Sequence, residues 1–89
     1  MTVTLRDRSE IALRFLGPEE QRRVQRALEQ LRTADVGQLQ SASQLHRLKG
    51  SGSGLFALRV TPRLRAILSR QGPDWVVEDI VSQSLVRHL

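Results

Sequence analysis

The stretch LFALRVTPRLRAILS, residues 55–69, alternates between apolar and other side chains along most of its length. Phe56, Leu58 and Val60 alternate with Ala57 and Arg59, and after Thr61-Pro62 the residues Leu64, Ala66 and Leu68 alternate with Arg63, Arg65 and Ile67. Such alternation is typical of a strand with one buried face, and Thr61-Pro62 is suited to a turn. The stretch therefore predicts two strands, residues 55–60 and 63–69, joined by a short turn.

Two further segments show the same period. WVVEDIV at residues 75–81 follows the turn residues Gly72, Pro73 and Asp74, and TVTLR at residues 2–6 alternates near the N-terminus. Because short connections join neighbouring antiparallel strands, the three later strands predict a meander. The N-terminal segment predicts one more strand.

Two helices are expected between the first strand and the meander. Ser9 can cap the first helix, which ends at Gly17. Pro18, followed by Glu19 and Glu20, starts the second helix. The apolar faces are Ile11, Ala12, Phe15 and Leu16 in the first helix and Val24, Ala27, Leu28 and Leu31 in the second. Residues 33–43 show no period, and we expect a loop there with at most a turn of helix.

These elements predict an α+β fold in a single domain, residues 1–89. It consists of a small antiparallel sheet, formed by the N-terminal strand plus the C-terminal three-strand meander, with the two N-terminal helices packed on one face. If Phe56, Leu58 and Leu64 face the helices, Arg59, Arg63 and Arg65 point to the opposite face. We expect Trp75 to belong to the core.

Composition excludes several classes of protein. The chain is 39% hydrophobic and 26% charged, and none of its apolar stretches approaches the roughly 20 residues that span a bilayer. Arg6, Asp7 and Glu10 fall where a signal peptide would be apolar, so we expect a cytoplasmic protein without a membrane partner. There is no cysteine, and His46 and His88 do not form a metal-ligand spacing, so neither a metal nor another cofactor is expected.

The net charge of +5 is concentrated in the second half of the chain. Residues 45–89 carry seven Lys/Arg against three Asp/Glu, and no acid occurs between Asp35 and Asp74. A one-sided basic surface favours RNA, DNA or an acidic protein segment as partner, although arginines on an exposed sheet face can also be plain solvated surface. In the second helix we assign Arg22, Arg23 and Arg26 to the solvated side, with Glu29 available to pair with Arg26. His46 is expected at the surface.

The order of short motifs resembles the RelE/ParE superfamily of bacterial toxins over nearly the whole chain. The matching pieces are Leu48-Lys49-Gly50, Gly54-Leu55-Phe56, Leu58-Arg59-Val60, Leu64-Arg65 and Asp79-Ile80-Val81. The resemblance implies a toxin of a type II toxin-antitoxin module, held in check by an antitoxin protein. RelE-like members cut messenger RNA at the ribosome without a metal ion, whereas ParE-like members inhibit DNA gyrase.

The resemblance also implies site residues. In the RelE branch basic side chains stabilise the charge that develops on phosphorus, and Arg59 and Arg65 match such positions, so both are predicted to be catalytic. His88 is a candidate acid or base, and Lys49, Arg63, Gln83 and Arg87 are predicted to bind phosphate.

The chain also departs from the family pattern. Ser82-Gln83-Ser84 replaces the usual histidine-arginine-serine, Ala57 replaces a basic residue, and Arg87 stands near the place of a C-terminal tyrosine, of which this chain has none. Three functions therefore remain open: a metal-independent endoribonuclease with a degenerate site, a gyrase inhibitor, and a non-catalytic binding protein with a toxin fold.

Overall fold

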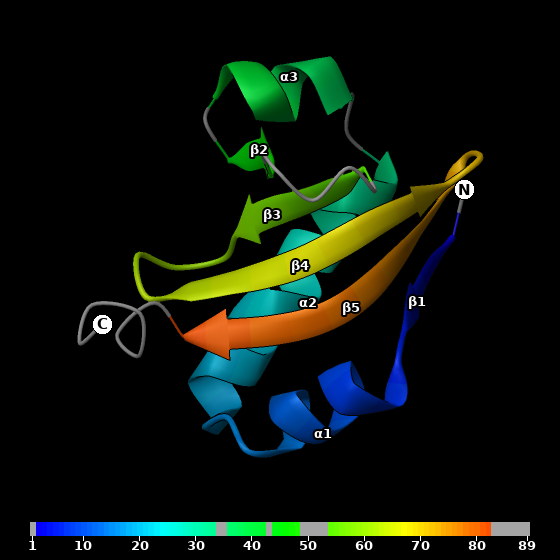
Figure 1. The fold of residues 1–89 in the computed structure, drawn as a ribbon. Helices are drawn as coiled ribbons and strands as arrows, with labels where there is room; N and C mark the ends of the chain where they lie inside the picture. Colours follow the sequence, from blue (N-terminus) through cyan, green and yellow to red (C-terminus); the bar gives the residue numbers. More distant parts are fainter. Residues whose placement is uncertain (1, 34–35, 43, 49–53, 83–89) are drawn as a thin grey trace.

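A five-stranded sheet with helices on one face forms the protein, for which a computed structural model describes residues 2–33, 36–42, 44–48 and 54–82 (Figure 1). The elements in chain order are β1 (Val3–Leu5), α1 (Asp7–Arg14), α2 (Pro18–Thr33), α3 (Val36–Ser41), β2 (Leu45–Arg47), β3 (Leu55–Arg59), β4 (Leu64–Gln71) and β5 (Asp74–Ser82). The predicted α+β class is confirmed.

The strand order is β1-β5-β4-β3-β2. β3, β4 and β5 form the predicted antiparallel meander, and β1 lies beside β5 as the N-terminal strand of the sheet. However, β1 runs parallel to β5, so the sheet is mixed rather than wholly antiparallel. Alternation indicates which face a residue occupies but not the direction of a strand, and no short connection links β1 to β5 to set that direction.

The sequence pattern missed a strand and a helix. β2 pairs with β3 at the end of the sheet, with Leu45 opposite Leu58, and α3 lies beside β2 (Figure 1). Leu39 of α3 and Leu45 of β2 are both buried in the core. Each element is too short to display a period, so tertiary packing rather than periodicity decides its conformation.

The core lies between α2 and the sheet. The predicted stripe of α2 is confirmed, since Val24, Leu28 and Leu31 are buried and Ala27 is half-buried. On the sheet side Leu58, Ala66, Leu68 and Val77 are almost fully buried. Trp75 is also in the core, with its ring 5.3 Å from that of Phe56 and the Arg70 guanidinium 4.6 Å from its centroid.

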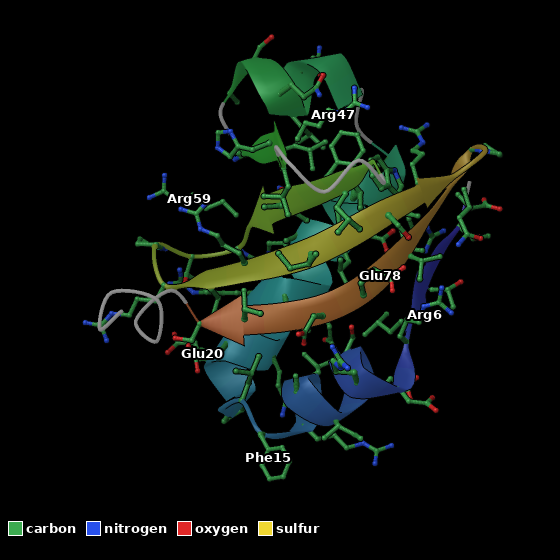
Figure 2. All side chains as sticks on the ribbon, in the orientation of Figure 1. Arg6, Phe15, Glu20, Arg47, Arg59 and Glu78 are labelled. Atoms are coloured by element: carbon green, nitrogen blue, oxygen red, sulfur yellow. The ribbon has the colours of Figure 1, made fainter. Side chains whose placement is uncertain are left out.

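The face that α1 turns to the sheet differs from the prediction. Ser9 does not cap the helix; it lies within α1, fully buried, and its hydroxyl donates a 2.7 Å hydrogen bond to the Val77 carbonyl of β5. This bond places Ser9, Ala12, Leu13 and Leu16 toward the core. Ile11 and Phe15, which we assigned to the buried face, are 53% and 86% exposed, and Phe15 points away from the protein in Figure 2.

Candidate functional site

The face of the sheet opposite α1 and α2, here called the outer face, brings two predicted catalytic residues together. Arg59 at the end of β3 is directly opposite Arg65 of β4 in the antiparallel register. Directly opposed residues project from the same face, with Cβ atoms about 4.5–5.5 Å apart. Arg59 is exposed and Arg65 is half-buried, so both arginines reach the surface from neighbouring positions on this face.

Local hydrogen bonds fix the backbone around this pair. The Arg59 N–H donates to the Gln44 carbonyl at 2.8 Å, which ties the end of β3 to the segment before β2. In the turn between β3 and β4, the Thr61 hydroxyl oxygen accepts bonds from the N–H groups of Arg63 and Leu64 at 3.1 and 3.0 Å. Arg63 is thereby held, exposed, in this turn, two residues before Arg65.

His46 is a candidate site residue that sequence reasoning missed. It lies opposite Ala57 in the register, and Ala57 precedes Arg59 by two residues on the same face of β3. The exposed imidazole is therefore the diagonal neighbour of Arg59 on the outer face. The sequence does alternate here between apolar Leu45 and polar His46, as a strand with one buried face would. However, a strand of three residues is too short to be recognised from this alternation.

The other predicted site residues, Lys49, Gln83, Arg87 and His88, lie outside the described residues. Their assignment to the site stays a prediction from the family resemblance.

Carboxylates occupy the β5 side of the outer face and are engaged by N-terminal arginines. Glu78 accepts hydrogen bonds from the Ser69 hydroxyl at 2.6 Å and from Arg6 Nε at 3.0 Å. Figure 2 labels Glu78 and Arg6, which lie next to each other. The Ser69 bond, and then the Arg6 bond, lower the pKa of Glu78 below its ordinary value. Asp79 lies 4.0 Å from Arg8. Both of these carboxylates are therefore paired with arginines of the N-terminal segment.

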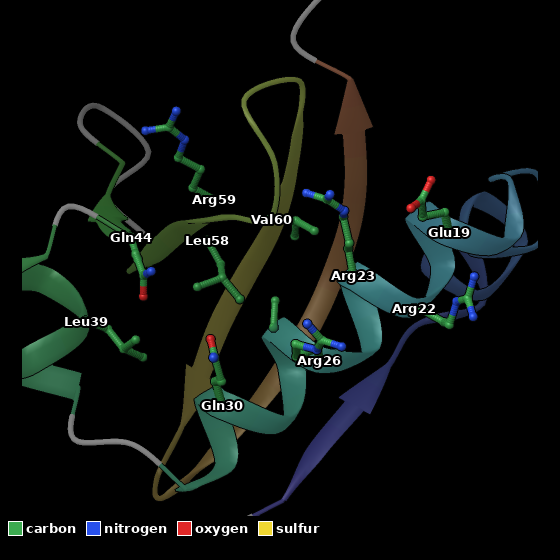
Figure 3. A pocket seen from close by; sticks show the side chains of 11 residues that line it. Glu19, Arg22, Arg23, Arg26, Gln30, Leu39, Gln44, Leu58, Arg59 and Val60 are labelled. Carbon is green, nitrogen blue, oxygen red and sulfur yellow. The ribbon is translucent and has the colours of Figure 1, made fainter.

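A second basic region lies beside α2. Arg22, Arg23, Arg26 and Arg59 line an open groove of about 600 Å³ between α2, α3 and the end of β3 (Figure 3). We predicted that Glu29 could pair with Arg26, but Glu29 instead accepts a 3.2 Å bond from Arg32, one turn further along α2. Sequence reasoning assigned these helix arginines to plain solvated surface because it could not place β3 next to them.

The described residues contain no group of three or more His, Cys, Asp or Glu side chains arranged to hold a metal ion. Within the same part of the chain, no helix combines the length and apolar character needed to cross a bilayer.

Comparison with known proteins places this architecture among bacterial and archaeal toxins. No family model matches the chain, and no curated protein matches it in sequence. Among solved structures, it is similar to YafQ from Escherichia coli strain BL21(DE3), with a TM-score of 0.74, 13% identity and 94% of each chain covered.

Two further solved structures are similar. The RelB-RelE antitoxin-toxin complex from Methanococcus jannaschii gives a TM-score of 0.72 at 9% identity and 94% coverage of each chain. The YoeB/ParE toxin from Agrobacterium tumefaciens gives 0.65 at 19% identity, covering 92% of this chain and 98% of that chain. On this evidence of shape, the chain has the fold of the RelE/ParE superfamily of toxins.

Proposed function

We propose that this protein is the toxin of a type II toxin-antitoxin module and that it cuts messenger RNA in the cytoplasm, at the ribosome. The observation that carries the proposal is the direct opposition of Arg59 and Arg65 on the outer face. The toxin fold shared with YafQ and RelE supports it.

Metal-independent cleavage of RNA needs three events. A base removes the proton of the 2′-hydroxyl, the resulting oxyanion attacks phosphorus, and the bond from phosphorus to the 5′-oxygen breaks as that oxygen receives a proton. The products are a 2′,3′-cyclic phosphate and a 5′-hydroxyl. Two neighbouring guanidinium groups suit the middle step, because each donates charged hydrogen bonds to the oxygens on which negative charge develops. We assign that role to Arg59 and Arg65, with Arg63 binding an adjacent phosphate.

His46 is our candidate for proton transfer among the described residues. An imidazole has one nitrogen that can donate a proton and one that can accept it, and the register sets His46 diagonal to Arg59 on the same face. His88, predicted from the sequence, remains a second candidate. Lys49, Gln83 and Arg87 are proposed to extend the contacts to RNA.

The proposed protein partner is an antitoxin. The solved RelB-RelE structure is that of an antitoxin-toxin complex. On the outer face of this chain Arg59 and Arg65 lie opposite each other, and such neighbouring cations favour the binding of an acidic segment. An antitoxin lying over Arg59 and Arg65 would block access of RNA to the same groups.

The test is a cleavage assay on ribosomes programmed with end-labelled messenger RNA. We expect Arg59→Ala and Arg65→Ala each to slow cleavage by about 100-fold to 1,000-fold, the usual cost of removing one electrostatic contact to the transition state. The matched control is Arg14→Ala, which removes an exposed arginine of α1. Equal rates for all three variants and the wild type would refute this site, provided that their melting temperatures agree.

Inhibition of DNA gyrase is the alternative, favoured by the similarity to the YoeB/ParE toxin and by the loss of the family's histidine-arginine pair at Ser82-Gln83. If the wild type arrests growth, leaves ribosome-bound messenger RNA intact and blocks DNA supercoiling by purified gyrase, this alternative replaces the nuclease. If it does none of these things, the protein is a non-catalytic binding protein with a toxin fold.

A further inference from the structure

Two apolar side chains lie next to each other on the outside of α1. Ile11 and Phe15 are the exposed large apolar residues of the described part of the chain. The Phe15 N–H donates to the Ile11 carbonyl at 3.3 Å, so Phe15 follows one helical turn after Ile11 and projects from the same side. The hydrogen bond of Ser9 to β5 turns the other side of α1 toward the core. The fold itself therefore holds this apolar pair at the surface.

An acid and a base lie beside the apolar pair. Glu10 precedes Ile11 and Arg14 precedes Phe15, so the two charged side chains are also one turn apart, with the acid nearer the start of α1. Both are exposed, and neither makes an ion pair with another described residue. The surface thus offers opposite charges at its two ends to a partner.

The charge of α1 is balanced, although the protein is basic. The helix carries two acids and two bases, whereas the whole chain has a net charge of +5. Nucleic acids and anionic membranes are attracted by an excess of positive charge, which this helix lacks. Two copies of a basic chain repel each other least where their surfaces are neutral. The balance therefore favours a second copy of this chain over a polyanionic ligand.

A two-fold axis across α1 matches both the apolar and the charged residues. It sets two copies of the helix antiparallel, so that Phe15 meets Ile11 of the second copy and Arg14 meets Glu10, with each contact formed twice. The two contacts are centred one residue apart, about 1.5 Å along the helix axis, which the long side chains of Arg14 and Glu10 accommodate. The antiparallel arrangement also sets the opposite ends of the two helix dipoles beside each other.

We propose that the exposed side of α1 is a self-association surface through which two copies of this chain form an antiparallel, two-fold symmetric dimer. Phe15 and Ile11 form its apolar centre, and the pairs of Glu10 with Arg14 form its polar rim. A contact built on a helix of eight residues buries less than the roughly 1,200 Å² of a stable complex, so we expect a weak dimer with a dissociation constant of about 100 μM.

This dimer leaves the outer face open. α1 packs beside β5, whereas Arg59 belongs to β3, two strands further along the sheet. Figure 2 shows Phe15 pointing away from the protein, well apart from Arg59. The proposal does not rest on catalysis, because association is measured on the protein alone. At protein concentrations well below about 100 μM the chain is monomeric, so Arg14→Ala remains a control in the cleavage assay.

Sedimentation equilibrium of the whole chain, from about 10 μM to about 1 mM, tests the proposal because mass action shifts a weak dimer over this range. We expect the average mass to rise from that of one chain toward that of two. Ile11→Ser and Phe15→Ser should each weaken association at least about 10-fold by removing the apolar centre. The matched control Pro62→Ser removes an exposed apolar side chain from the β3–β4 turn and should alter association less than about 3-fold.

An exchange of charge tests the antiparallel arrangement. Glu10→Arg and Arg14→Glu should each weaken association at least about 10-fold, because each sets like charges opposite one another. An equimolar mixture of these two variants should associate at least about 10-fold more tightly than either variant alone, since every charge then meets its opposite. The control variants Glu29→Arg and Arg32→Glu make the same changes in net charge on the exposed side of α2 and should stay within about 3-fold of the wild type, alone or mixed.

Melting temperatures equal to that of the wild type establish that the variants are folded. The proposal is overturned if the wild type remains a single chain at about 1 mM, or if Ile11→Ser and Phe15→Ser associate as the wild type does. It is also overturned if the mixture of Glu10→Arg with Arg14→Glu associates no more tightly than its components. Cosedimentation with vesicles of phosphatidylcholine and phosphatidylglycerol that is lost in Phe15→Ser would instead assign this surface to a membrane.

Discussion

Leu58 and Arg59 are consecutive residues of one strand, yet they belong to the two opposite faces of the sheet. Leu58 is 3% exposed and packs under α2, whereas Arg59 is exposed beside Arg65. The helix-packed face gains its stability from apolar area removed from water. The outer face gathers cations at some electrostatic cost. The difference indicates that the first face maintains the fold, whereas charged residues on the second face do not contribute to the core and are the ones to which we assign the proposed function.

The largest expected effect comes from placing the same charged side chain at each of these two neighbouring positions in turn. Leu58→Asp should abolish cooperative folding, because an unpaired carboxylate buried in the core costs several kcal/mol. Arg59→Asp places the same side chain on the exposed face and should melt close to the wild-type temperature. Circular dichroism melting measures both, and a Leu58→Asp variant that melts cooperatively near the wild-type temperature would contradict the assignment of the two faces.

A gain of function would sharpen the assignment of the outer face. Gln83 stands where the resembled family carries a cation, and an amide cannot neutralise the charge that develops on phosphorus. Gln83→Arg should therefore accelerate cleavage on programmed ribosomes by about 10-fold or more, a fraction of what one such contact contributes. Gln83→Lys adds the same charge without the planar fork and should gain less; if neither variant exceeds the wild-type rate, Gln83 does not belong to the site.

Substitutions at two adjacent residues test which side of α1 faces the core. Leu16 packs against the core and Phe15 is 86% exposed. Leu16→Ser should lower the free energy of unfolding by about 1–2 kcal/mol, whereas Phe15→Ser should change it by less than about 0.5 kcal/mol. Urea denaturation measures the free energy of unfolding of both variants. A larger loss for Phe15→Ser would indicate that Phe15 faces the core, as the sequence pattern predicted.

The smallest expected effect concerns pH and the carboxylate of the outer face. The pKa of Glu78 is lowered from its ordinary value of 4.5, first by the Ser69 hydroxyl and then by Arg6, so the ionised form stabilises the folded state. That contribution is complete above the unfolded pKa and is lost as the pH falls through the lower pKa of the folded state. The loss therefore occurs below about pH 4.5.

Glu78→Gln cannot titrate and should lose less stability than the wild type between pH 6 and pH 3. Melting temperatures at the two pH values measure this difference. Glu20→Gln, an exposed change on α2, is the control, and an identical pH profile for the wild type and Glu78→Gln would show that the Glu78 contacts do not contribute.

The period of apolar residues predicted the buried side of a long element correctly. It failed for short elements and for a helix whose buried side contains a polar residue. The sixteen residues of α2 repeat their apolar stripe often enough to identify the buried side. In α1 the apolar residues suggested a face through Ile11 and Phe15, but buried Ser9 and its hydrogen bond to Val77 select a different one. A hydrophobic pattern does not predict that a polar residue is buried in a packed face.

Side-chain periods of two and 3.6 along continuous segments are enough to predict the meander, the apolar stripe of α2 and the position of Arg59 on the face away from the core. Three other features are visible only in the folded chain, namely the parallel direction of β1, the placement of His46 diagonal to Arg59, and the groove that joins Arg23 and Arg26 to β3. These features depend on pairings between segments far apart in the chain, and no local preference encodes which distant segments meet.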